Sequence, residues 1–171
     1  MTRRDIIIKW VIYSLIIIFI MMIQLTGLGR LCVFGVHPMV MPLVAASLAV
    51  FEGPRAGGIA GFFTGFMCDA LIPPSTIFFT LIFMCAGIAI GYVTDYMFKR
   101  NFVTALMWMA ALKTSECLLF FFLFYFLSGK APLSALLSVA LPEIVFSLLF
   151  SPIIYFIIRT VYMRFYEEGI Y

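Results

Sequence analysis

Charged side chains are scarce in this chain. Lysine, arginine, aspartate and glutamate make up 11% of its 171 residues, whereas about a quarter of a soluble domain is charged. Hydrophobic residues make up 65%, and the mean hydropathy is +1.17. The basic residues form no stripe with interleaved aromatic side chains of the kind that binds nucleic acid. The composition therefore excludes a soluble globular domain and predicts a protein in contact with the lipid bilayer, with no nucleic-acid partner.

Residues that commonly carry out chemistry are equally few. The cysteines Cys32, Cys68, Cys85 and Cys117 stand singly inside apolar runs, so no CxxC or Cys/His group suggests a metal site or a disulfide framework. His37 is the single histidine, and nothing in the sequence pairs it with a serine as a base. No glycine-rich phosphate loop follows a strand pattern. The sequence therefore predicts a protein that is not an enzyme and that holds no metal or cofactor.

Long apolar runs fill the chain instead. About 20 helical residues cover the hydrocarbon core of a bilayer, and loops of fewer than about ten residues separate the runs. We expect an all-α polytopic membrane protein, a bundle of six transmembrane helices in one domain over residues 1–171. Two prolines, Pro38 and Pro42, either kink the start of the second span or follow a re-entrant turn over residues 33–37. The predicted spans are about 9–28, 33–51, 56–72, 76–97, 103–127 and 134–158.

Basic residues indicate the orientation of the bundle. Six spans place both termini on one side, and the side with more lysine and arginine in its short segments is the cytoplasmic one. With the termini inside, eight basic residues are cytoplasmic and two are external, so we expect cytoplasmic N- and C-termini. The inner set is Arg3, Arg4, Lys9, Arg55, Lys99, Arg100, Arg159 and Arg164, and the outer set is Arg30 and Lys130.

Glycines recur at every fourth residue in two neighbouring spans. Residues four apart share one face of a helix, so these glycines form a face without side chains that another backbone can approach closely. The sequence predicts close helix packing there, either within the bundle or against a helix of a partner protein, and self-association is also open. The positions are Gly53, Gly57, Gly61 and Gly65 in the third span and Gly87 and Gly91 in the fourth.

Charged residues flank the glycine-rich span. At its inner end Glu52 and Arg55 stand three apart in a turn signal, Glu52-Gly53-Pro54-Arg55. Near its outer end lies Asp69, and an acid at that depth requires water or a partner. Two interpretations are open: Asp69 faces water at the interface, or it pairs within the bundle, where Arg30 is the nearest cation by topology.

Three further charges fall inside the last two spans. Lys113 and Glu116 are three residues apart on the fifth span, which allows an ion pair along one helix. Glu143, after Pro142 in the sixth span, is placed to join them or to cap a broken helix. Unpaired charges at this depth are costly. We interpret the three as a polar knot between the two spans, and a proton or ion path is the alternative.

The segment MPLVAASLAVFEGPRAGGIAGFFTGFMCDAL, residues 41–71, combines a proline-led apolar span, a charged turn with a glycine, and a glycine-rich span. Its last part, GFMCDAL at residues 65–71, has the form G-[FL]-x-x-D-[AL]-L. These features resemble the rod shape-determining protein MreD family of bacteria. The length, the span count and the late SPIIY at residues 151–155 are also similar to that family, whereas PPST at residues 73–76 departs from its usual glycine-containing turn.

The resemblance implies a function. Members of that family are multi-pass proteins of the bacterial cytoplasmic membrane and act as non-enzymatic scaffolds in cell elongation, rod shape and peptidoglycan synthesis. The implied partner is the bitopic protein MreC and, through it, MreB, RodA and a penicillin-binding transpeptidase. The family's fold is similar to that of the substrate-binding subunits of energy-coupling factor vitamin transporters, which is the alternative function. An intramembrane enzyme or proton channel using Lys113, Glu116 and Glu143 is a third hypothesis.

Overall fold

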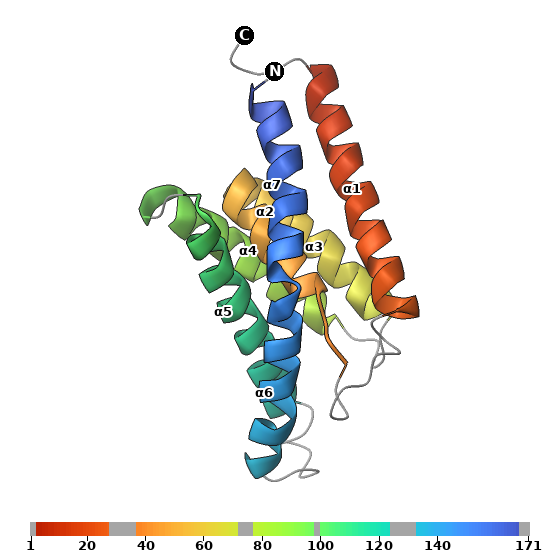
Figure 1. The fold of residues 1–171 in the computed structure, drawn as a ribbon, viewed down its shortest axis with the longest axis vertical. Helices are drawn as coiled ribbons and strands as arrows, with labels where there is room; N and C mark the ends of the chain where they lie inside the picture. Colours follow the sequence, from red (N-terminus) through yellow and green to blue (C-terminus); the bar gives the residue numbers. More distant parts are fainter. Residues whose placement is uncertain (1–2, 28–36, 72–76, 98–99, 124–132, 168–171) are drawn as a thin grey trace.

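Seven helices and no strand make up the part of the chain that the structure describes (Figure 1). The structure is a computed structural model, and it describes residues 3–27, 37–71, 77–97, 100–123 and 133–167. The all-α fold class is confirmed for these residues. The helices are α1 (Arg3–Thr26), α2 (Met41–Glu52), α3 (Pro54–Leu71), α4 (Phe78–Met97), α5 (Phe102–Phe121), α6 (Leu133–Leu149) and α7 (Ser151–Glu167).

The short helix α2 forms the centre of the bundle. Every residue from Met41 to Phe51 is buried, and α2 packs against α3, α4, α5 and α7 (Figure 1). An α-helix that is apolar on all sides has no polar face for solvent, so other helices cover it all round. Its 12 residues span only about 18 Å, less than the predicted second span.

Pro42 explains why α2 begins where it does. Proline has no N–H to donate to the carbonyl four residues earlier, and its ring would collide with that carbonyl. The helix therefore starts at Met41, and residues 37–40 before it are not helical. The re-entrant turn considered for residues 33–37 falls almost entirely outside the described residues.

Side chains of two other helices satisfy the backbone of this non-helical entry. Gln24 of α1 donates from Nε2 to the carbonyl of Pro38 at 2.7 Å and accepts at Oε1 from the Val40 N–H at 3.0 Å. The Met39 N–H donates to Ser147 Oγ of α6 at 3.0 Å. Backbone groups at membrane depth need partners, so these contacts allow an irregular segment inside the bundle.

Gly53 lies between α2 and α3 and is not part of either helix. Its φ of +82° lies in the left-handed region, which glycine adopts without steric cost. Its N–H donates to the Ala49 carbonyl at 3.1 Å, and its own carbonyl accepts from the Gly57 N–H at 2.8 Å. One residue thus closes α2 and opens α3, and the prediction that the glycine ladder runs through a single helix from Gly53 is wrong.

The last predicted span, 134–158, is broken into α6 and α7. The segments 140–149 and 151–165 meet at an angle of 42°. Pro152, in the first turn of α7, cannot donate to the carbonyl of Leu148, so the hydrogen-bond ladder is interrupted there. At the break, the Phe150 N–H donates to the backbone carbonyl of Ser147, three residues earlier, at 3.1 Å. Helix α7 then continues to Glu167. Pro142 lies inside α6 without ending it.

Part of the bundle consists of helices whose length and hydropathy suit a transmembrane segment. Three described helical segments are long and apolar enough to cross a membrane, namely Arg4–Thr26, Phe78–Met97 and Phe102–Phe121. The bent pair of α6 and α7 is a fourth if it counts as one span. Of the remaining helices, α2 is too short, and α3 carries four glycines, an arginine and an aspartate.

Candidate functional site

The glycine ladder of α3 lies against the backbone of α4. A Cβ atom at Gly57 would lie 2.6 Å from the carbonyl oxygen of Gly87, which is closer than side chains approach backbone. A Cβ at Gly61 would collide with the carbonyl of Phe83, and one at Gly65 would lie 2.5 Å from a carbonyl oxygen of α4. These glycines therefore let the two helices approach to backbone contact.

Glycines of α4 complete this interface. A Cβ at Gly91 would lie 2.5 Å from the carbonyl carbon of Gly53, and one at Gly87 would meet Gly57. All six glycines singled out in the sequence thus meet at or beside the contact of α3 with α4. Because α4 occupies this face, it is not a groove for a helix from another protein.

Asp69 caps the amino-terminal end of α4. Its Oδ1 accepts from the Phe79 N–H at 3.1 Å, and its Oδ2 accepts from the N–H and the hydroxyl of Thr80 at 2.7 and 2.6 Å. A helix start has unpaired N–H groups and a partial positive charge, which a carboxylate satisfies. The carboxylate is buried in this contact, so Asp69 does not face water, and it pairs within the bundle with the start of α4. Arg30 itself lies outside the described residues.

The three charges in α5 and α6 come together in one cluster. Lys113 Nζ donates to Glu116 Oε2 at 2.7 Å along α5 and to Glu143 Oε1 at 2.5 Å across to α6. The Lys113 side chain is fully buried, and that of Glu143 is 21% exposed. The geometry is that of the polar knot predicted between these helices. It joins one ammonium to two carboxylates, so the cluster has more acid groups than basic ones.

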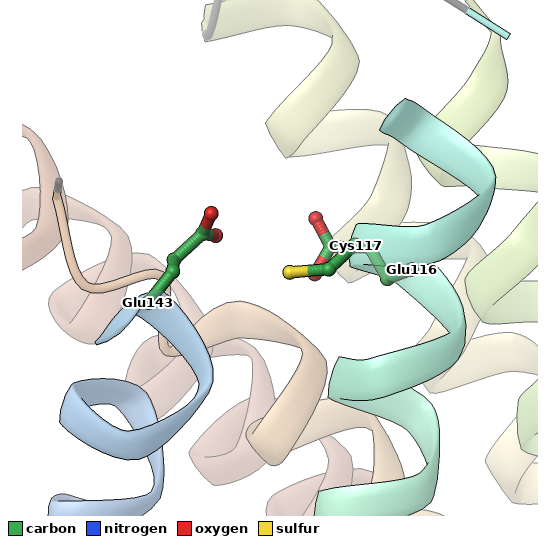
Figure 2. A group of neighbouring side chains, drawn as sticks. All are labelled: Glu116, Cys117 and Glu143. Carbon is green, nitrogen blue, oxygen red and sulfur yellow. The ribbon is translucent and has the colours of Figure 1, made fainter. Parts of the chain in front are cut away.

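The thiol of Cys117 lies close to the two carboxylates of this cluster. Figure 2 shows the side chains of Glu116 and Cys117 from α5 and of Glu143 from α6 pointing towards a common region. One potential ligand atom from each lies within 4.8 Å of the others, as a metal site requires. Lys113 Nζ, however, already donates to both carboxylates and supplies the positive charge that a metal ion would bring. The arrangement therefore fits an ion-pair cluster better than a metal site.

A second polar network links α1 to the end of α2. Lys9 Nζ pairs with Glu52 Oε2 at 2.5 Å, and Tyr13 donates its hydroxyl to Glu52 Oε1 at 2.7 Å. The Lys9 ammonium also lies over the ring of Tyr162 of α7, 5.7 Å from its centre. Glu52 therefore pairs with α1 and not with Arg55. No sequence pattern paired Lys9 or Tyr13 with Glu52, although their spacing of four places both on one face of α1.

Arg100, which lies just before α5, joins this network. Arg100 donates to Asp95 Oδ1 at 2.8 Å and to the Tyr162 hydroxyl at 2.5 Å. Burial acts to lower the pKa of Arg100, but the hydrogen bonds to Asp95 and Tyr162 outweigh it and raise the pKa above its ordinary value. Arg100 stays charged and binds the end of α4 to α7.

Comparison of the chain with protein-family models, with curated protein sequences and with solved structures found no match.

Proposed function

We propose that the protein is a non-enzymatic membrane scaffold of the MreD type, acting in the bacterial cell-elongation machinery. It binds an MreC-like bitopic protein through its outward helix faces and, through that partner, acts with MreB, RodA and a penicillin-binding transpeptidase. The chain crosses the cytoplasmic membrane six times, with both termini in the cytoplasm. The resemblance of residues 41–71 and 151–155 to the MreD family supports this choice of family.

The observation that carries this proposal is that the buried charged side chains of the described residues pair with other helices of the same bundle. Asp69 caps α4, Glu52 binds α1, and Lys113 joins α5 to α6. Each of these groups pairs with another part of the same bundle. One surface hollow lies along α3 and α4, and another lies along the first half of α1. Their linings are apolar except for Arg55 in the first and Ser14 in the second, so neither has a set of converging polar side chains for a small substrate. Such a construction suits a rigid binding body more than a substrate-binding subunit.

The outward faces supply the binding surfaces. Large apolar side chains project from α1 and from α3 to α7, for example Leu15 and Phe19 of α1 at 60% and 66% exposure. Such faces contact either lipid or the helix of another membrane protein. A single-span partner can therefore dock without any change in the buried polar pairs.

Contacts between helix ends support the six crossings and their orientation. The beginning of α1, the junction of α2 and α3, the turn at Arg100 and the second half of α7 meet in one network. Asp69 and the start of α4 pair elsewhere. Helices α1 to α5 therefore alternate in direction, and α6 and α7 together run back towards the network as one bent pair. The start of α1 and the end of α7 lie at the same end of the molecule (Figure 1). Lys9, Arg55 and Arg100 belong to the network end, as the positive-inside rule expects of a cytoplasmic side.

The test is purification from native membranes combined with site-specific crosslinking. A photo-crosslinking residue is placed at an exposed position and at a matched buried position of each of four helices. The exposed and buried pairs are Ile18 and Ile17 in α1, Ile88 and Ile90 in α4, Met107 and Met109 in α5, and Ile157 and Ile158 in α7.

Under the proposal a single-span protein copurifies and crosslinks from exposed positions of one contiguous face. The buried members of the pairs give crosslinks only within the chain. Copurification of ATP-binding subunits together with a bound vitamin-like molecule, and of no bitopic protein, would overturn the proposal in favour of a transporter subunit.

A further inference from the structure

A hollow of about 540 Å³ runs along the outer side of the α3–α4 pair, and we refer to it as the α3–α4 groove. Its floor is Gly58, where a Cβ atom would lie 2.7 Å from Ile88 Cγ1. Its walls include Ile59, Phe62 and Phe63 of α3, which are 42–56% exposed. The groove is therefore an open slot between aromatic and aliphatic side chains on the surface that faces away from α2.

Arg55 is the one charged residue in the lining of this groove. Its side chain is exposed and makes no ion pair or hydrogen bond with the residues that the structure describes. Arg55 lies in the first turn of α3, at the end of the bundle where Glu52 pairs with Lys9. Two exposed tyrosines of α4, Tyr92 and Tyr96, follow the stretch of α4 that packs on this end of α3. Aromatic and basic side chains together are typical of the headgroup level of a membrane.

The apolar part of the groove runs inward from that level. Phe62 and Phe63 lie seven and eight residues after Arg55, about two helical turns or roughly 11–12 Å deeper in the bundle. A slot with one guanidinium at headgroup depth and only apolar side chains below it matches the two parts of a phospholipid. Arginine forks bind phosphate through paired hydrogen bonds, and basic pockets between helices on the cytoplasmic side bind anionic head groups.

A helix from another protein fits this groove less well. Close helix contact uses faces of small residues, and the small-residue face of α3 is already covered by α4. Gly58 is the only glycine on the groove floor, and it lies between side chains that project outward. An acyl chain is narrow enough to follow such a slot.

We propose that the α3–α4 groove binds one acyl chain of an anionic phospholipid whose phosphate pairs with Arg55. The lipid then lies as an ordered boundary lipid on a helix pair that is in backbone contact.

Native mass spectrometry of the delipidated full chain in detergent tests this proposal. Phosphatidylglycerol and phosphatidylcholine with identical acyl chains are added separately. The variants are Arg55→Gln, which removes the phosphate partner, and Ile59→Trp, which fills the groove. The matched control is Arg164→Gln, which removes an exposed positive charge of α7 outside the groove.

The wild-type protein and the Arg164→Gln control should retain one phosphatidylglycerol molecule in preference to phosphatidylcholine. Arg55→Gln should weaken phosphatidylglycerol binding about tenfold, as expected for the loss of one charge-assisted contact. It should weaken phosphatidylcholine binding less, because the choline ammonium already offsets the charge of that phosphate. Ile59→Trp should weaken both.

Three results would overturn the proposal. The first is equal retention of the two lipids by the wild-type protein, a comparison that requires no variant to fold. The second is an equal loss in Arg55→Gln and Arg164→Gln, which would indicate unspecific attraction to negative charge. The third is a wild-type dimer that Ile59→Trp dissociates, which would show that a second copy of the chain fills the groove.

Discussion

At the scale of single residues, Lys113 is the group on which the α5–α6 contact depends. Its ammonium is fully buried and binds the carboxylates of both Glu116 and Glu143. Removing one partner of a buried ion pair leaves an uncompensated charge, which costs more than the pair itself contributes. The loss of stability caused by a substitution in this cluster therefore depends on the net charge of the groups that remain buried.

Replacing Lys113 should destabilise the protein more than replacing Glu116. Lys113→Met leaves two carboxylates facing each other without a cation, and we expect a loss of about 3–5 kcal/mol in the free energy of unfolding. Glu116→Gln leaves one ammonium opposite one carboxylate, and the expected loss is about 1 kcal/mol. Thermal unfolding of the purified variants in detergent measures both. An equal loss for the two substitutions would contradict the charge-balance argument.

Asp69 should matter more than Asp95, although both are aspartates in ion-pair or hydrogen-bond contacts. Asp69→Asn weakens three hydrogen bonds at the buried start of α4 and should cost about 1–2 kcal/mol. Asp95→Asn is the matched control, because the Asp95–Arg100 pair is about one-third exposed and such pairs contribute no more than about 1 kcal/mol. Chemical unfolding of the two variants gives the comparison, and a larger loss for Asp95→Asn would refute the capping role of Asp69.

At the scale of helices, contacts between residues of one helix could be predicted from their spacing in the sequence, whereas contacts between different helices could not. The separation of Lys113 and Glu116 predicted an ion pair within α5, and the fourfold glycine spacing predicted close packing of α3. The sequence did not indicate that Asp69 would cap α4 or that Glu52 would bind Lys9, because these pairs depend on which helices are adjacent. The break before Pro152 was also missed, since a proline in an apolar run either kinks a helix or ends it, depending on its surroundings.

The α3–α4 contact predicts a difference between two glycines of the same helix. Gly61→Ala adds a methyl group against the backbone of α4, which cannot move aside, and should cost about 1–3 kcal/mol. Gly58→Ala adds the same methyl group against the side chain of Ile88, which is half exposed and can rotate. Its effect should be near zero because alanine also favours the helix. Unfolding midpoints in detergent test this, and equal midpoints for the two variants would contradict backbone contact at Gly61.

At the scale of the whole molecule, the proposed topology assigns the two ends of α4 to opposite sides of the membrane. Ile77 and Asn101 flank α4 and are both exposed. In a background with the four native cysteines replaced by alanine, a membrane-impermeant maleimide added from outside should label Ile77→Cys and not Asn101→Cys. The reverse pattern would show that the orientation is inverted, and labelling of both would show that α4 does not cross.

Under the proposed function the cluster of Lys113, Glu116 and Glu143 has a structural role and carries out no proton transfer or transport, and the protein works by binding other proteins. The most direct test is the triple variant Lys113→Met, Glu116→Gln, Glu143→Gln, because replacing a complete buried ion cluster by neutral groups is often tolerated. Affinity purification of this variant from native membranes should recover the same single-span partner in the same amount as the wild-type protein. A triple variant that is folded and inserted but recovers no partner would contradict the claim.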